Sequence, residues 1–407
     1  MQTSITPEGF RIHALHKPDM PVVAIDIVVR GGYAESSWGT AWMRSLTQNE
    51  ATKSYPGGKI AEILDFNGAN YKSSVESHFT RFSLLALDGK IDAVLPTFAE
   101  IVGCPTFPDH EFAVRREAIA SQLEVYQENV SYLASIESDR QIMGIDHPLA
   151  RFDTPAQIRD ITPADVAAIQ QRFTCRDSVD IFVWGNITPT LQSKIAETLS
   201  LTIPEGIAPD LIIEPFSPAP PADRRLIRKD NASQCAVFIT IPSIPRNHPD
   251  YLPLHMAVYA LGGYFGSRLM LNIREDKGLT YGISASLNGN IDGAFTLISA
   301  ETDNRHCSRL IDEVAAELSR LATDPPHGDE LTRMRRSALA DQIAAADSPA
   351  SIVSHHITEL MMRLPENYFA DKLNTINTIT PEQIALAASR YLNPELTRVA
   401  VAGNPEK

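Results

Sequence analysis

Two hydrogen-bonding side chains, Arg274 and Tyr281, lie seven residues apart in the segment NIREDKGLTYGI of this 407-residue chain. Arginine carries a fixed fork of N–H donors and a permanent charge, and tyrosine adds a phenolic donor. Both types suit a carbonyl oxygen on which negative charge develops. Each residue also has an ordinary structural interpretation, because arginine often compensates the dipole at a helix C-terminus and tyrosine at the start of a strand often packs in a core.

The other reactive residue types do not form a hydrolytic motif. The sequence has no Ser-His-Asp signature and no G-x-S-x-G segment, and the Gly-rich LGGYFGSR lacks the lysine of a phosphate-binding loop. His355 and His356 are adjacent, so their side chains on a helix point ~100° apart and chelate a metal poorly. Four widely spaced cysteines predict free thiols in a reducing compartment.

Composition bounds the classes of partner. A chain of 407 residues with 43% hydrophobic side chains predicts two to four domains. The net charge of −14 and the pI of about 5.3 argue against binding to nucleic acid or an anionic membrane, although a basic surface inside a cavity is compatible with them. The N-terminal residues have no apolar signal region and no apolar run reaches ~18 residues, so we expect a cytoplasmic protein.

The elements that must position these residues are strands and helices in separate runs. PVVAIDIVVRGG, FTRFSLLALD and AFTLISAE are typical of strands. The i, i+3, i+4 spacing of apolar residues predicts helices in the segments KIDAVLPTFAEIVG, HEFAVRREAIASQLEVYQENVSYLASI, HCSRLIDEVAAELSRLA and DELTRMRRSALADQIAAA. Grouped strands and grouped helices favour an α+β fold with antiparallel sheets.

The two halves of the chain resemble one another. Residues 161–187 and 379–405 align without a gap, each with an Ile-Thr-Pro helix start, an apolar strand and a Gly-Asn turn. A Pro-rich linker at 204–224 separates them. We therefore predict homologous domains at 1–203 and 225–407.

The order of segments is similar to that of the pitrilysin family of zinc metallopeptidases, the inverzincins. The resemblance rests on VVRGGYAESSWGTAWMRSL, FNGANYKSSVESHFTRFSLLAL, REAIASQLEVYQENV, DHPLARFDTPAQIRDITPADVAAIQQRF and GGYFGSRLMLNIREDKGLTYGI, in that order. It implies two α+β domains, each an antiparallel sheet with helices on one face, that form half of a clam-shaped chamber.

The residues that carry the family's chemistry are missing. Where the family has H-x-x-E-H, the first zinc ligand falls on Trp42, the general base on Ser45 and the second ligand on Leu46, and the third ligand falls on Gln122. An indole N–H, an isobutyl group and a neutral amide cannot hold zinc, and serine cannot take the proton of a zinc-bound water. We expect no metal in this chain and apolar residues that repack the emptied site as a core.

The resemblance assigns Arg274 and Tyr281 to the pair that hydrogen-bonds the substrate across the chamber. The leading hypothesis is a non-catalytic subunit of a heterodimeric metallopeptidase, binding a peptide or unfolded polypeptide with a homologous H-x-x-E-H partner that carries the zinc. The alternative is an inactive scaffold or a peptide-binding homodimer.

Overall fold

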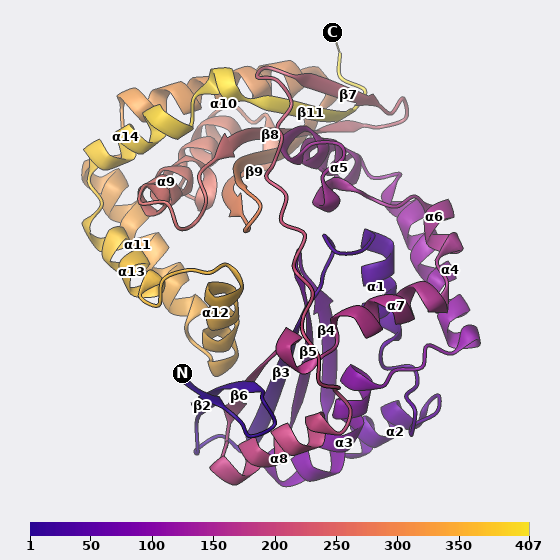
Figure 1. Cartoon of the computed structure of the whole chain (residues 1–407). Helices are drawn as coiled ribbons and strands as arrows, with labels where there is room; N and C mark the ends of the chain where they lie inside the picture. The colour runs from indigo at the N-terminus through magenta and orange to yellow at the C-terminus, as the bar shows by residue number, and fades with distance from the viewer. Residues whose placement is uncertain (407) are drawn as a thin grey trace. The chain divides into compact units, whose positions relative to one another are not determined.

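The computed structural model describes residues 1–406, which divide into two compact units (Figure 1). Unit 1 comprises Met1–Glu124, Arg151–Ile213 and Ser348–Ser354; unit 2 comprises Val125–Ala150, Glu214–Asp347 and residues 355–406. The units therefore exchange segments, because 125–150 come from the first half of the sequence and 348–354 from the second. Residues 204–220, within the predicted linker, form no helix or strand.

Unit 1 contains a six-stranded sheet in the order β1-β2-β6-β3-β5-β4. Its strands are Gln2–Ile5 (β1), Arg11–His16 (β2), Val22–Arg30 (β3), Asn70–Val75 (β4), Phe79–Leu87 (β5) and Val179–Gly185 (β6). The hydrophobic residues of α3 and α8 pack with β3, β5 and β6 into one core. The helices are Trp38–Thr47 (α1), Lys59–Phe66 (α2), Ile91–Gly103 (α3), Asp109–Tyr126 (α4), Pro155–Asp160 (α6), Pro163–Phe173 (α7) and Pro189–Ser200 (α8).

Unit 2 contains a five-stranded sheet in the order β7-β11-β8-β10-β9. Its strands are Arg224–Arg228 (β7), Gln234–Ser243 (β8), Thr280–Gly289 (β9), Ala294–Asp303 (β10) and Arg398–Gly403 (β11). One face of the sheet packs on a core to which α9, α10 and α14 contribute. The helices are Val130–Met143 (α5), Tyr251–Val258 (α9), Cys307–Thr323 (α10), Gly328–Ala345 (α11), Pro349–Met361 (α12), Tyr368–Thr378 (α13) and Pro381–Tyr391 (α14).

Helix α5 covers the other face of the unit 2 sheet. Ala134 of α5 is fully buried against Ala236 of β8 and Ala402 of β11. The small side chains allow the helix to approach the sheet backbone closely. In the second half of the sequence, α12 follows α10 and α11 in the same place that α5 follows α3 and α4, and its first residues belong to unit 1.

The two sheets share one topology apart from the extra strand β1. In each, the last strand in chain order is parallel to one neighbour and antiparallel to the other: β6 lies between β2 and β3, and β11 lies between β7 and β8. The α+β prediction is confirmed. The sheets are mixed rather than purely antiparallel, because a long connection, unlike a hairpin, does not force adjacent strands to run in opposite directions.

The predicted helix at 110–136 is two helices. It ends as α4 at Tyr126, and Asn129 then caps α5 by accepting a hydrogen bond from the Tyr132 N–H at 3.1 Å. The i, i+3, i+4 spacing of apolar residues does not reveal this break. Among residues 1–406, no helix combines the length and apolarity needed to cross a membrane.

Candidate functional site

Helix α1 carries the degenerate metal-binding positions. It begins after Ser37, whose side chain accepts a hydrogen bond from the Thr40 N–H at 3.1 Å. The Gly39 N–H donates to Asp153 Oδ2 at 2.6 Å, and a Cβ on Gly39 would lie 2.2 Å from Ile158 Cδ1. A larger residue at position 39 would therefore require the end of the Ile158 side chain to shift.

The side chains at the three α1 positions form packing and hydroxyl contacts. Trp42 is half-buried, with its ring 4.6 Å from that of Trp38. Ser45 is buried; its hydroxyl lies 2.7 Å from Ser73 Oγ on β4, and the Ser73 hydroxyl donates to the Ser45 carbonyl at 2.8 Å. Leu46 is 36% exposed, so the prediction that the former metal site is refilled as core is wrong for this residue.

Gln122, at the place of the third ligand, is exposed on α4. A catalytic zinc needs about three N, O or S donors with lone pairs. Trp42 and Leu46 offer none, and a neutral amide is a weak substitute for a carboxylate. Among residues 1–406, no three His, Cys, Asp or Glu side chains group in a way that could hold a metal ion. The residues present do not fit the family's zinc.

Behind this surface lies Arg44, which no motif in the sequence marks. Arg44 is 1% exposed, and its guanidinium donates to Gln170 Oε1 from Nε at 3.1 Å and from Nη2 at 2.8 Å. Nη2 also donates to Thr174 Oγ1 at 3.1 Å. Burial lowers the pKa of Arg44 to about 10. The clue in the sequence was its place between Trp42 and Ser45, on the inner face of α1.

In unit 2, Arg274 and Tyr281 lie on consecutive elements. Arg274 belongs to the π-helical segment η5 (Met270–Asp276), and Tyr281 is the second residue of β9. Gly278 turns the chain between them with a φ of +60°, which favours glycine. Segments of π-helix are rare and often occur at functional sites.

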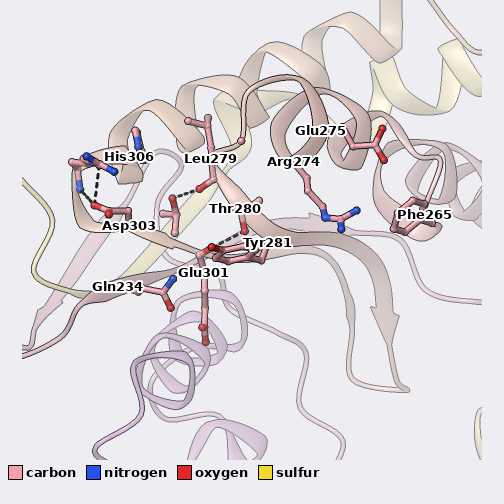
Figure 2. Close-up of a pocket in the computed structure, with 13 residues that line it drawn as sticks. Gln234, Phe265, Arg274, Glu275, Leu279, Thr280, Tyr281, Glu301, Asp303 and His306 are labelled. Carbon is pink, nitrogen blue, oxygen red and sulfur yellow. Dashed lines mark hydrogen bonds and ion pairs between the residues drawn. The ribbon is translucent and has the colours of Figure 1, made fainter.

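The two side chains line the same cavity (Figure 2). Its volume is about 700 Å³. The Arg274 guanidinium stacks over the ring of Phe265, 4.9 Å from its centroid, and Tyr281 is 92% exposed. An arginine held on an aromatic face keeps its N–H groups at the ring's edge free to bind an acceptor. No motif in the sequence marks Phe265 as part of this site.

Both candidate sites adjoin the edge of a sheet. Strand β4, tied to α1 through Ser73, pairs only with β5, and β9 pairs only with β10 in the described part of the chain. On β9, Ser284 and Ser286 are exposed. An extended peptide can add to such an edge through backbone hydrogen bonds. The arrangement can therefore hold a peptide without any metal.

The two α+β units and the altered H-x-x-E-H positions define a protein that is metallopeptidase-like in fold but lacks the family's metal-binding side chains. The model described as "Insulinase (Peptidase family M16)" matches residues 11–141, and "Peptidase M16 inactive domain" matches residues 160–338. Together they cover most of the chain. The chain belongs to peptidase family M16.

Several known proteins are similar over much of their length. "Uncharacterized zinc protease YmxG" of Bacillus subtilis is 19% identical over 97% of each chain, and "Non-peptidase homolog YmxG" of Helicobacter pylori is 22% identical over 65% of this chain and 62% of its own. The crystal structure of a peptidase M16 inactive domain from Pseudomonas fluorescens has a TM-score of 0.90 and 26% identity, covering 100% of this chain and 98% of that one. The inactive-domain and non-peptidase descriptions, with the missing donors, support a catalytically inactive member.

Proposed function

We propose that this chain is the non-catalytic subunit of a heterodimeric M16 metallopeptidase, whose homologous partner carries H-x-x-E-H and the zinc. The observation that supports it most is that the metal-binding residues are replaced while the substrate-binding pair is retained. Trp42, Ser45 and Leu46 have replaced every α1 residue that the chemistry needs, while Arg274 and Tyr281 still line one cavity. Selection for an inert scaffold alone would not require both hydrogen-bond donors to remain.

In this role the chain binds and orients a peptide, and the cleavage belongs to the partner. Arg274, braced by Phe265, donates to a carbonyl oxygen of the peptide, and the Tyr281 hydroxyl supplies a second donor. The edge of β9 pairs with the peptide backbone. Such donors contribute to catalysis when they lie where negative charge develops.

The test is co-expression with a homologous H-x-x-E-H chain, with peptide cleavage as the readout. We expect Arg274→Ala to lower kcat/KM by about 100-fold, the scale of a lost oxyanion donor, and Tyr281→Phe by about tenfold. Arg309→Ala, at an exposed arginine of α10, is the matched control and leaves the rate unchanged. Unchanged activity in both site variants, with the heterodimer intact by size exclusion, contradicts the proposal.

The alternative is a homodimeric scaffold or peptide holder. The free edges of β4 and β9 favour it, because they offer backbone pairing that is independent of any zinc. Size exclusion with light scattering of the chain purified alone separates the two. A stable homodimer that does not bind the H-x-x-E-H homologue supports the scaffold, whereas a heterodimer with that homologue supports the leading proposal.

A further inference from the structure

A second cavity in unit 2 has a chemistry different from that of the Arg274 site. Its volume is about 270 Å³, and the two cavities share no lining residue. Four basic side chains line it: Arg246 before α9, His255 on α9, His355 on α12 and Lys372 on α13. Four separate segments thus bring basic side chains to one small space in a chain whose net charge is −14.

The strongest of these cations is incompletely satisfied. The Arg246 Nε atom is buried and has no hydrogen-bond partner among residues 1–406. Glu359 is the one carboxylate among the lining residues, and its Oε2 lies 3.6 Å from Nδ1 of His356. A buried donor without an acceptor costs free energy, and it leaves the positive charge of Arg246 only partly compensated beside the cavity.

Burial and the neighbouring positive charges disfavour the charged forms of three of these side chains. Burial, with the charges of Lys372 and Arg246, lowers the pKa of His255 to about 3. Burial and the charge of Arg246 lower the pKa of Lys372 to about 8. Burial and the charge of Lys372 lower the pKa of His355 as well. An anion bound here would relieve this repulsion.

Neutral donors and an apolar wall complete the lining. Gln342 and the hydroxyls of Tyr251 and Tyr368 add hydrogen-bond donors, and Phe369 and Leu287 add apolar surface. An arginine fork, an ammonium and several neutral donors together exceed what a planar carboxylate accepts, and they match the three oxygens of a phosphate group. The volume lies just below that of drug-sized sites, which fits a small ligand.

We propose that this cavity binds a small phosphate-bearing molecule, with Arg246 and Lys372 as the residues that hold the phosphate group. The site goes beyond the peptide-binding role and depends on none of its residues. The enclosed volume selects against nucleic acids, whose backbones the acidic surface also repels.

Isothermal titration calorimetry of the full chain tests the proposal, with glycerol 3-phosphate and inorganic phosphate as probes at constant ionic strength. We expect saturable binding that Arg246→Gln and Lys372→Met each weaken by at least about tenfold. Arg336→Gln, at an exposed arginine of α11 outside the cavity, is the control and binds normally. Circular dichroism confirms that each variant is folded.

Several outcomes overturn the proposal. They are the absence of binding by the folded wild type, an equal loss in Arg336→Gln, and acetate binding as tight as that of either probe. Tighter binding of inorganic phosphate than of its glycerol ester would also contradict an organic ligand.

A pH series with sulfate, whose charge is constant, isolates Lys372. As pH rises from about 7 to about 9, Lys372 loses its proton through its pKa of about 8, so sulfate affinity falls. His255 is already neutral and Tyr368, with a pKa of about 12, stays neutral. The groups that face Lys372 from the surrounding elements are Arg246, His255, Asp341, His355, Glu359 and Tyr368. Lys372→Arg should remove the pH dependence; its persistence in that variant contradicts a role for Lys372.

Discussion

At the scale of single residues, a buried polar network lies on the inner face of α1, behind the positions that match the family's metal ligands. Gln170 is its centre: its Oε1 accepts from Arg44 and, at 3.2 Å, from Gln48 Nε2, while its own Nε2 donates to the Val102 carbonyl at 2.7 Å. Arg44 keeps its charge here through neutral hydrogen bonds and a contact with the Phe82 ring at 5.6 Å. α1 therefore depends on a residue of α7 that no motif marks.

Gln170→Leu tests this dependence. The change removes both hydrogen bonds from the buried Arg44 guanidinium to Gln170 Oε1 and leaves it the one to Thr174 Oγ1, so we expect the free energy of unfolding to fall by about 2 kcal/mol or more. Urea denaturation followed by circular dichroism measures it. Gln171→Leu, at the exposed neighbouring position, serves as the control. A loss no greater than that of the control contradicts a structural role for the network.

The resemblance to H-x-x-E-H was enough to locate Trp42, Ser45 and Leu46, but it could not give their environments. Exposure of Leu46 and the Ser45–Ser73 contact depend on how β4 lies beside α1, which is a tertiary property. Phe265 was missed for the same reason, because it lies nine residues from Arg274 and only the irregular π-helical segment brings them together.

At the scale of elements, the duplicated Ile-Thr-Pro starts are the most predictable part of the molecule. Thr162 and Thr380 both form complete capping boxes, with Asp165 and Gln383 reaching back to the cap N–H at 2.8 and 2.9 Å. Local hydrogen bonds fix such starts, so the sequence predicts them well. The break between α4 and α5 separates helices that belong to different units, and it could not be read from apolar spacing.

We expect Thr162→Ala and Thr380→Ala each to lower the free energy of unfolding by about 1 kcal/mol, because each leaves a helix N–H without its side-chain acceptor. Thr→Ser at the same positions keeps the acceptor and should retain most of the stability. Urea titrations of the four variants compare them directly. An alanine variant as stable as its serine counterpart would show that the cap hydrogen bond contributes nothing.

At the scale of the whole molecule, the chain combines an M16 fold with residues that do not fit the zinc of that family. Fold and duplication could be predicted because both leave periodic patterns over hundreds of residues. The exchange of segments between the units could not, because nothing in the linker composition shows that 125–150 join the second sheet. The cavity at Arg246 and Lys372 was equally hidden, since its four basic residues are scattered over more than 120 residues.

The chain purified alone should take up no stoichiometric zinc. Elemental analysis after dialysis against zinc and then metal-free buffer measures the bound metal, with an H-x-x-E-H homologue as the positive control. The expected zinc content is near zero, because no described cluster supplies three donors. One tightly bound zinc per chain, with chelator-sensitive peptide cleavage, would overturn the inactive assignment.

The alanine contact of α5 with β8 and β11 has a consequence for how the protein can be divided. A fragment starting at residue 225 would lack the helix that seals one side of its own sheet, and a fragment ending at 203 would lack the start of α12. Each half of the sequence thus supplies a segment that completes the compact unit of the other half. Cutting the linker should yield two pieces that regain structure only when mixed, so the natural breakpoint in the sequence is not a breakpoint in the fold.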